Sequence, residues 1–245
     1  MRRQLPQLEG LRLDGRALPF GLPALDSHLP LGGLAFGALH EVAPETASAL
    51  PAAFGFVAAL LGRMPPAGPA LLVTSKRGLA DCGSPHGHGL NALGLDPARV
   101  ILVEARHEQQ ALWAMEEALR SGAPVAVAGA VGAGLDLKAS QRLQLAARSS
   151  GLPLLLLQPA SAMGASAATT RWRIGSAEAA RDRFGLIAGW RWRVRLERCR
   201  NGRSGEWLLE WDHVAHRFSL AAAVADPALH RSTDPRLRVA STGRS

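Results

Sequence analysis

The stretch that decides the fold is LDSHLPLGGLAFGALHEVAPETASALPAAFGFVAALL, residues 25–61. Residues 39–42 are typical of a short strand, and residues 47–61 are a run of alanines and large apolar side chains with helix-forming composition. A strand, a turn of about eight residues and an apolar helix together form the layout of a P-loop, in which backbone N–H groups and a helix N-terminus bind phosphate.

The turn itself lacks the residues of the P-loop pattern G-x-x-x-x-G-K-[ST]. Ala43 and Ser48 stand in place of the glycines, Ala49 in place of the lysine and Leu50 in place of the Ser or Thr. Phosphoryl transfer needs the lysine, the hydroxyl and an acid that closes the metal shell. No acid follows directly after the strand expected at residues 124–128. The sequence therefore predicts a protein without a nucleotide cofactor that is not an enzyme, although amides of the turn could still hold an anion weakly.

Length and composition fit one large domain. The chain has 245 residues, of which 47% are hydrophobic and 20% are charged, enough for a sizeable core. No apolar run reaches the ~18 residues of a membrane span, and no apolar segment of a secretory signal follows the basic first residues. Cys82 and Cys199 are too few for a disulfide framework. We expect a cytoplasmic protein without a membrane partner.

Apolar strands alternate with helices through the first two thirds of the chain. Strands that are apolar throughout and alternate with helices predict a mostly parallel sheet covered on both faces, and so a three-layer α/β core. The expected strands are residues 39–42, 70–74, 100–103, 124–128 and 152–157, and the expected helices are residues 47–61, 108–121 and 138–149.

The ends of the chain have a different character. Residues 1–24 show no clear period and are interpreted as an arm that packs on the domain or on a partner. The domain itself spans residues 25–225, and its last part, residues 171–225, is predicted to be an antiparallel extension because polar and apolar residues alternate there. Residues 226–245 are polar, basic and proline-containing, which predicts a flexible tail.

Asn201-Gly202 marks a hairpin turn within the extension. We favour a four-residue loop, because a two-residue loop would set Glu197 opposite Glu206. Either loop gives the same two faces. One face carries Trp190, Trp192, Val194, Leu196, Trp207, Leu209 and Trp211, and the other carries Arg191, Arg193 and Arg195 beside Glu206, Glu210 and Asp212.

The formal charge is +8, and only Lys76 and Lys138 of the 28 basic residues are lysines. Arginine richness has two explanations, a GC-rich genome or an anionic partner such as DNA. Basic segments with interleaved aromatic residues are typical of proteins that bind single-stranded DNA. In the alternative interpretation, the strand pairing of the hairpin places its tryptophans in the core and neutralises its arginines. The candidate contacts to DNA or a protein partner are the arginines without a predicted neighbour: Arg171, Arg173, Arg181, Arg183, Arg198, Arg200, Arg203, Arg231, Arg236 and Arg238.

Several stretches carry a resemblance to a known family. Residues 25–42 resemble the entry to the first core strand of RecA-type recombinases. ALWAMEEALR at residues 111–120 and WLLEWDH at residues 207–213, together with the degenerate P-loop, look like the ImuA family, RecA-like accessory proteins of bacterial mutagenic translesion synthesis. The resemblance covers about residues 25–225.

The resemblance implies a RecA-like fold and a non-catalytic subunit that works after DNA damage, in the SOS response. Its implied partners are ImuB, an inactive Y-family polymerase homologue, and an error-prone C-family DNA polymerase, with RecA and single-stranded DNA as further partners. No metal is predicted, because the spacing of Cys82, His86 and His88 matches no standard zinc site. Two alternatives stay open: a SulA-like cell-division inhibitor that binds a tubulin-like GTPase, and an unorthodox NTPase that uses Lys76 or Arg77 on phosphates.

Overall fold

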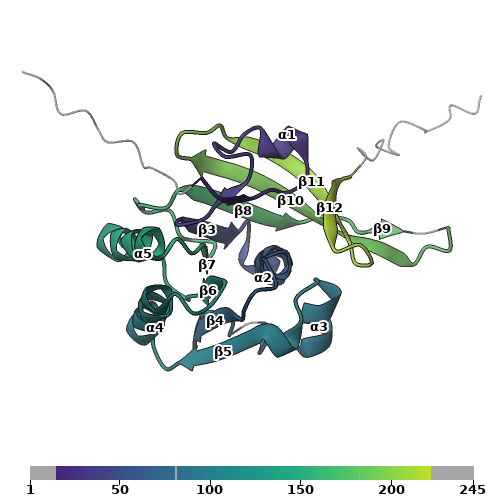
Figure 1. Ribbon diagram of the computed structural model, residues 1–245. Coiled ribbons are helices and arrows are strands. Elements are labelled where there is room, and N and C mark those ends of the chain that lie inside the picture. Colours follow the sequence, from purple (N-terminus) through teal and green to yellow (C-terminus); the bar gives the residue numbers. More distant parts are fainter. Residues whose placement is uncertain (1–14, 81, 182, 222–245) are drawn as a thin grey trace, which may run out of the picture.

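One large sheet runs through the molecule, with strand order β12-β11-β10-β8-β3-β7-β6-β4-β5 and β9 paired to β10 (Figure 1). The computed structural model describes residues 15–221 except residues 81 and 182. The neighbours from β8 to β5 pair in parallel, and those from β8 to β12 pair antiparallel. This confirms the predicted α/β fold. The parallel strands are β3 (Leu39–Pro44), β4 (Ala70–Ser75), β5 (Val100–Ala105), β6 (Ala126–Ala130), β7 (Leu154–Leu157) and β8 (Thr170–Ser176).

Helices cover both faces of the parallel strands, as Figure 1 shows. α2 (Leu50–Gly62) lies on one face, above one cluster of buried apolar side chains. α4 (Glu108–Ser121) and α5 (Leu137–Ser150) lie on the other face and share a second cluster. Gly122 and Gly151 end α4 and α5 with positive φ angles of 65° and 69°. Glycine adopts this left-handed conformation with less steric strain than any other residue, because it has no Cβ. The short helices are α1 (Pro23–Asp26), η1 (Ala47–Ala49), α3 (Gly87–Ala92) and η2 (Pro97–Arg99).

One predicted boundary is wrong. The antiparallel extension was placed from Arg171 onward, but β8 pairs in parallel with β3 and antiparallel only with β10. β8 therefore belongs to the parallel core. The antiparallel part begins after it and consists of β9 (Ala180–Arg181), β10 (Ile187–Cys199), β11 (Gly205–Asp212) and β12 (Arg217–Leu220).

The two faces of the β10–β11 hairpin are as predicted. Trp190 lies opposite Trp211 and Arg195 opposite Glu206, so the apolar and the charged side chains separate onto different faces. The predicted four-residue loop is too short, because five residues, 200–204, separate the two strands. Asn201 takes a positive φ of 62°, which asparagine tolerates well.

The described part of the predicted N-terminal arm is built into the domain. β1 (Ala17–Leu18) pairs with β2 (Leu34–Ala35), and the ring of Phe20 is buried. The carboxylate of Asp26 accepts the backbone N–H groups of Phe20, Gly21 and Leu22 at 2.8 to 3.0 Å. These bonds fix the chain as it enters the core. Residues 1–14 of the arm and residues 226–245 of the predicted tail lie outside the described residues.

Across residues 15–221, positions 81 and 182 apart, no helix combines the length and apolar character that crossing a membrane requires.

Candidate functional site

The turn between β3 and α2 has the position of a P-loop, but its last two amides are bonded within the turn. Ala49 and Leu50 donate their backbone N–H groups to the carbonyls of Thr46 and Ala47, which closes the single turn η1. The next residue, Pro51, has no N–H at all. Three successive positions at the start of α2 therefore offer no free amide hydrogen to an anion.

An ion pair lies beside this turn. Glu45 follows β3 directly, and its Oε2 lies 3.0 Å from Nη1 of Arg193. The carboxylate lies over Gly175, where a Cβ would come within 2.2 Å of the same oxygen. Ala49, which takes the place of the P-loop lysine, is buried. An anion at this turn would therefore find no lysine, and the arginine nearby is already paired with a carboxylate.

The nearest acid beyond β6 caps a helix. Asp136 accepts the N–H of Ala139 at 2.6 Å and is the N-cap of α5. An acid that the sequence analysis missed lies closer to the strand ends. Glu108 accepts both the hydroxyl of Ser75 at 2.8 Å and the N–H of Gly132 at 2.9 Å, so it links the ends of β4 and β6. Glu108 opens α4, and its place in the sequence gives no sign of this linking role.

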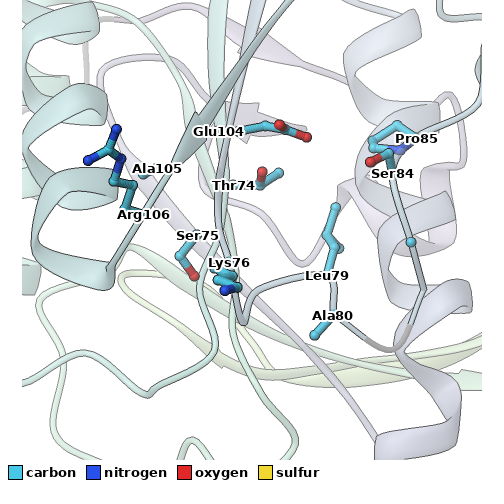
Figure 2. A pocket seen from close by; sticks show the side chains of 11 residues that line it. Thr74, Ser75, Lys76, Leu79, Ala80, Ser84, Pro85, Glu104, Ala105 and Arg106 are labelled. Carbon is cyan, nitrogen blue, oxygen red and sulfur yellow. The ribbon is translucent and has the colours of Figure 1, made fainter.

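A polar cleft of about 400 Å³ opens at the ends of β4 and β5. Figure 2 shows Thr74 and Glu104 pointing from these neighbouring strands toward the loop that carries Leu79 and Ser84. Lys76, one of the two basic residues considered for an unorthodox NTPase, lines this cleft. The lining includes no residue of the degenerate turn, 43–50. This cleft therefore does not include the degenerate turn.

The structure separates the candidate arginines into groups by burial. Arg173 was predicted to have no partner, and this is wrong: its side chain is 6% exposed, and its Nε donates to Glu197 at 3.0 Å. Arg171 forms an ion pair with the buried Glu41 at 2.9 Å. Both side chains point from β8 toward residues 158–169, which cover this face of the strand. Two charges that the sequence pattern placed in solvent are therefore partly or fully buried.

Two more candidate arginines brace the same segment. Arg198 donates to the carbonyls of Ser166 and Ala168 at 2.8 and 2.9 Å, and Arg200 donates to the carbonyl of Ala167 at 3.4 Å. Burial, and then the nearby charge of Arg171, lower the pKa of Arg198. These half-buried arginines therefore bind the backbone of residues 166–168 and are only partly accessible to a partner.

The exposed candidates are Arg181, Arg183 and Arg203. Arg183 lies over the ring of Phe184, 4.7 Å from its centroid, and Arg181 donates to the carbonyl of Gly185 at 2.7 Å. These two arginines share one projecting hairpin, whereas Arg203 lies in the β10–β11 loop. Arg231, Arg236 and Arg238 fall outside the described residues.

The charged face of the β10–β11 hairpin is neutralised, in part by acids other than those predicted. Arg191 pairs with Glu210 across the strands at 2.7 Å, as expected. Arg193 instead pairs with Glu45 at 3.0 Å, and Arg195 pairs with Glu197 at 3.2 Å. The arginine face therefore joins the hairpin to the degenerate turn.

Comparison with known proteins gives the family. The chain is 38% identical over 237 residues to Protein ImuA of Caulobacter vibrioides strain NA1000 / CB15N, and the match covers 89% of this chain and 93% of that protein. Protein ImuA of strain ATCC 19089 / CIP 103742 / CB 15 matches with the same identity and coverage. No family model matches the chain. Identity at this level over almost the whole of both chains leaves one conclusion: the chain belongs to the ImuA family.

Proposed function

We propose that this protein is a non-catalytic accessory subunit of a damage-induced complex for mutagenic translesion DNA synthesis. The observation that carries the proposal is the contrast between a fully packed α/β core and a degenerate P-loop at its centre. The turn that would hold a nucleotide uses the amides of Ala49 and Leu50 on its own carbonyls, buries Ala49 in the lysine position and carries Glu45 already paired with Arg193. Such a domain retains surfaces for partners without the groups that hydrolysis needs.

The subunit bridges the other members of the complex. Its partners in this proposal are an ImuB-type inactive Y-family polymerase homologue and an error-prone C-family DNA polymerase. RecA filaments and single-stranded DNA are additional contacts that bring the complex to a lesion, in the cytoplasm. Membership of the ImuA family supports this set of partners.

Co-purification tests the bridging role. The full chain and a chain that ends at residue 225 are each mixed with the purified ImuB homologue and, separately, with RecA. Retention by the full chain is the expected result. Loss on truncation would make residues 226–245 the contact, and equal retention would move the contact to the folded domain. Retention of neither partner would overturn the proposal.

Thermal unfolding tests the non-catalytic part separately. A nucleotide that binds the folded protein, present at a free concentration of 100 times its dissociation constant, would raise the free energy of unfolding by about 2.7 kcal/mol. We expect Mg·ATP to leave the melting temperature unchanged, with RecA as the positive control. A clear upward shift that disappears in Lys76→Ala would favour the unorthodox NTPase, because Lys76 lines the polar cleft.

A further inference from the structure

The hairpin made by β9 and the start of β10 projects from the body of the molecule (Figure 1) and has an apolar tip. Phe184, Leu186 and Ile187 are each at least 64% exposed, and Trp190 is 40% exposed. These are four large apolar side chains within seven consecutive residues. Isolated exposed apolar residues are ordinary, but a contiguous group of this kind marks an interaction surface.

The apolar surface continues from the tip into a groove. Ile187 and Trp190 line a small hollow of about 170 Å³ beside the turn that follows β11. Trp190 also forms one wall of a groove of about 450 Å³, which is predominantly apolar and includes Phe54 of α2, Leu90 of α3 and Trp192. One tryptophan therefore joins the two hollows, and the tip and groove form a single surface, which we call the hairpin surface.

Two arginines with no acidic partner among the described residues stand at the tip of the hairpin surface. Residues 178–193 contain four arginines and two acids, and two of those arginines, Arg191 and Arg193, are paired with Glu210 and Glu45. Arg181 and Arg183 are exposed at the tip. Arg191 lines the groove, although it is paired with Glu210. A complementary partner presents carboxylates beside its apolar side chains. A second copy of this chain would bring the same two arginines to face Arg181 and Arg183 and would carry the same net charge of +8, so like charge opposes self-association.

The tip suits a protein better than a nucleic acid. Bases bind single-strand readers by stacking on free aromatic faces. Here the guanidinium of Arg183 covers the Phe184 ring at 4.7 Å from its centroid, and the neighbouring Leu186 and Ile187 are aliphatic. A groove that ends in aliphatic and tryptophan side chains accepts the large apolar anchors that dominate protein interfaces.

We propose that the hairpin surface is the docking site for a short segment of the ImuB-type partner, in which large apolar side chains alternate with or flank carboxylates. This inference rests on the proposed function. The apolar anchors enter the groove beside Trp190, and the carboxylates meet Arg181 and Arg183.

The test measures the dissociation constant between full-length chain and purified ImuB homologue. Leu186→Asp removes an apolar contact and adds a repelling charge, and Arg183→Glu reverses a charge. Each should raise the Kd at least about tenfold, the scale of a hot-spot residue. Leu186→Met should bind within about twofold of the wild type, because it keeps an apolar side chain of similar size.

Matched controls lie elsewhere on the molecule. Leu145 of α5 is 64% exposed against 65% for Leu186, so Leu145→Asp makes the same change at a remote site. Arg148→Glu, at an exposed arginine of α5, is the control for Arg183→Glu. Neither control should change the Kd. All variants should melt within about 2 °C of the wild type, since exposed substitutions cost little stability.

The outcomes separate the inference from the proposed function. Binding by the wild type that every variant retains would overturn the docking site and leave the accessory role standing. Absence of binding by the wild type would overturn the docking site, and it would overturn the accessory role as well if RecA is not retained either. Two further measurements apply to Leu186→Asp. In the first, loss of binding to single-stranded oligo(dT) while partner binding stays intact would identify a DNA contact instead. Conversion of a wild-type dimer to a monomer in light scattering would identify self-association.

Discussion

At the scale of single residues, His40 of β3 connects folding to pH. Its imidazole is buried beside the carbonyl of Ala35 at 2.8 Å and the hydroxyl of Thr170 at 2.8 Å. The Thr170 hydroxyl also accepts the indole N–H of Trp172 at 2.7 Å, which leaves its own hydrogen for the imidazole. Burial lowers the pKa of His40 to about 4, against a smaller raising effect of the bond to Ala35. The native structure therefore contains a neutral imidazole.

We predict that this residue makes the protein acid-sensitive above pH 4. The unfolded chain, with an ordinary histidine pKa of about 6.5, binds the proton first as the pH falls. The stability that the buried neutral His40 contributes is fully present above about pH 6.5 and declines toward pH 4. The loss between pH 7.5 and pH 5 is about 2 kcal/mol of the free energy of unfolding. Urea unfolding at several pH values checks this. His40→Gln should be less stable at pH 7.5 but should lose about 2 kcal/mol less on acidification; parallel pH profiles would contradict the prediction.

Arg173 carries the second residue-scale prediction. Its guanidinium is buried and donates to Glu197 and to the carbonyls of Pro44 and Ala160. Replacing it by methionine keeps much of the volume but leaves these acceptors without their donor. We expect Arg173→Met to lower the free energy of unfolding by about 1–3 kcal/mol. Arg203→Met, at an exposed arginine, should change it by less than about 0.5 kcal/mol, and denaturant titration compares the two.

At the scale of elements, the sequence predicts most of the core because the long helices and the parallel strands other than β8 carry their own local signals. The helix predicted at residues 108–121 is α4, with its apolar face on the sheet and Gly122 at its end. The degenerate turn was also predictable, since it depends only on which residues occupy four positions. These signals are local, and no distant residue changes them.

β8 was misread because its polar positions are not solvent-exposed. Trp172 and Ile174 point into the core, and the alternating Arg171 and Arg173 point to the other face, which gives the alternation of a half-exposed antiparallel strand. That second face is covered by residues 158–169, with Glu41 and Glu197 supplying the countercharges. The pairing partners lie up to 130 positions away, so no local pattern reveals them. The same lack of information hid the role of Glu108.

The N-terminal strand segment gives an element-scale prediction. Phe20 stacks with Phe56 of α2 at 6.1 Å between ring centroids and lies 5.5 Å from Trp172 and 5.7 Å from Phe218. Removing this ring leaves a cavity where three elements meet. We expect Phe20→Ala to destabilise the protein by about 3–5 kcal/mol, the usual cost for a buried phenylalanine. Denaturant unfolding measures the loss, and Leu31→Ala, at an exposed leucine of the same region, serves as the control.

At the scale of the whole molecule, one aromatic cluster joins parts of the chain that differ in architecture. Phe20, Phe56 and Trp172 belong to the N-terminal segment and the parallel core, and Trp192, Trp211 and Phe218 belong to the antiparallel strands. All six are buried in one apolar cluster between α2 and the sheet. The antiparallel extension is therefore a continuation of the core and shares its side chains. Its projecting hairpin surface rests on the most densely packed aromatic part of the protein.

This sharing predicts that residues 15–221 unfold in one cooperative transition. Tryptophan fluorescence reports chiefly the aromatic cluster, and far-UV circular dichroism reports the helices on both faces of the sheet. Because α2 packs on the cluster while α4 and α5 pack on the opposite face of the same strands, the two signals should change at the same urea concentration. Phe20→Ala should move both midpoints down together. If the fluorescence midpoint alone moved, or if two steps appeared, the antiparallel strands would be a separate unit, and the hairpin surface would rest on a part of the molecule that can open independently.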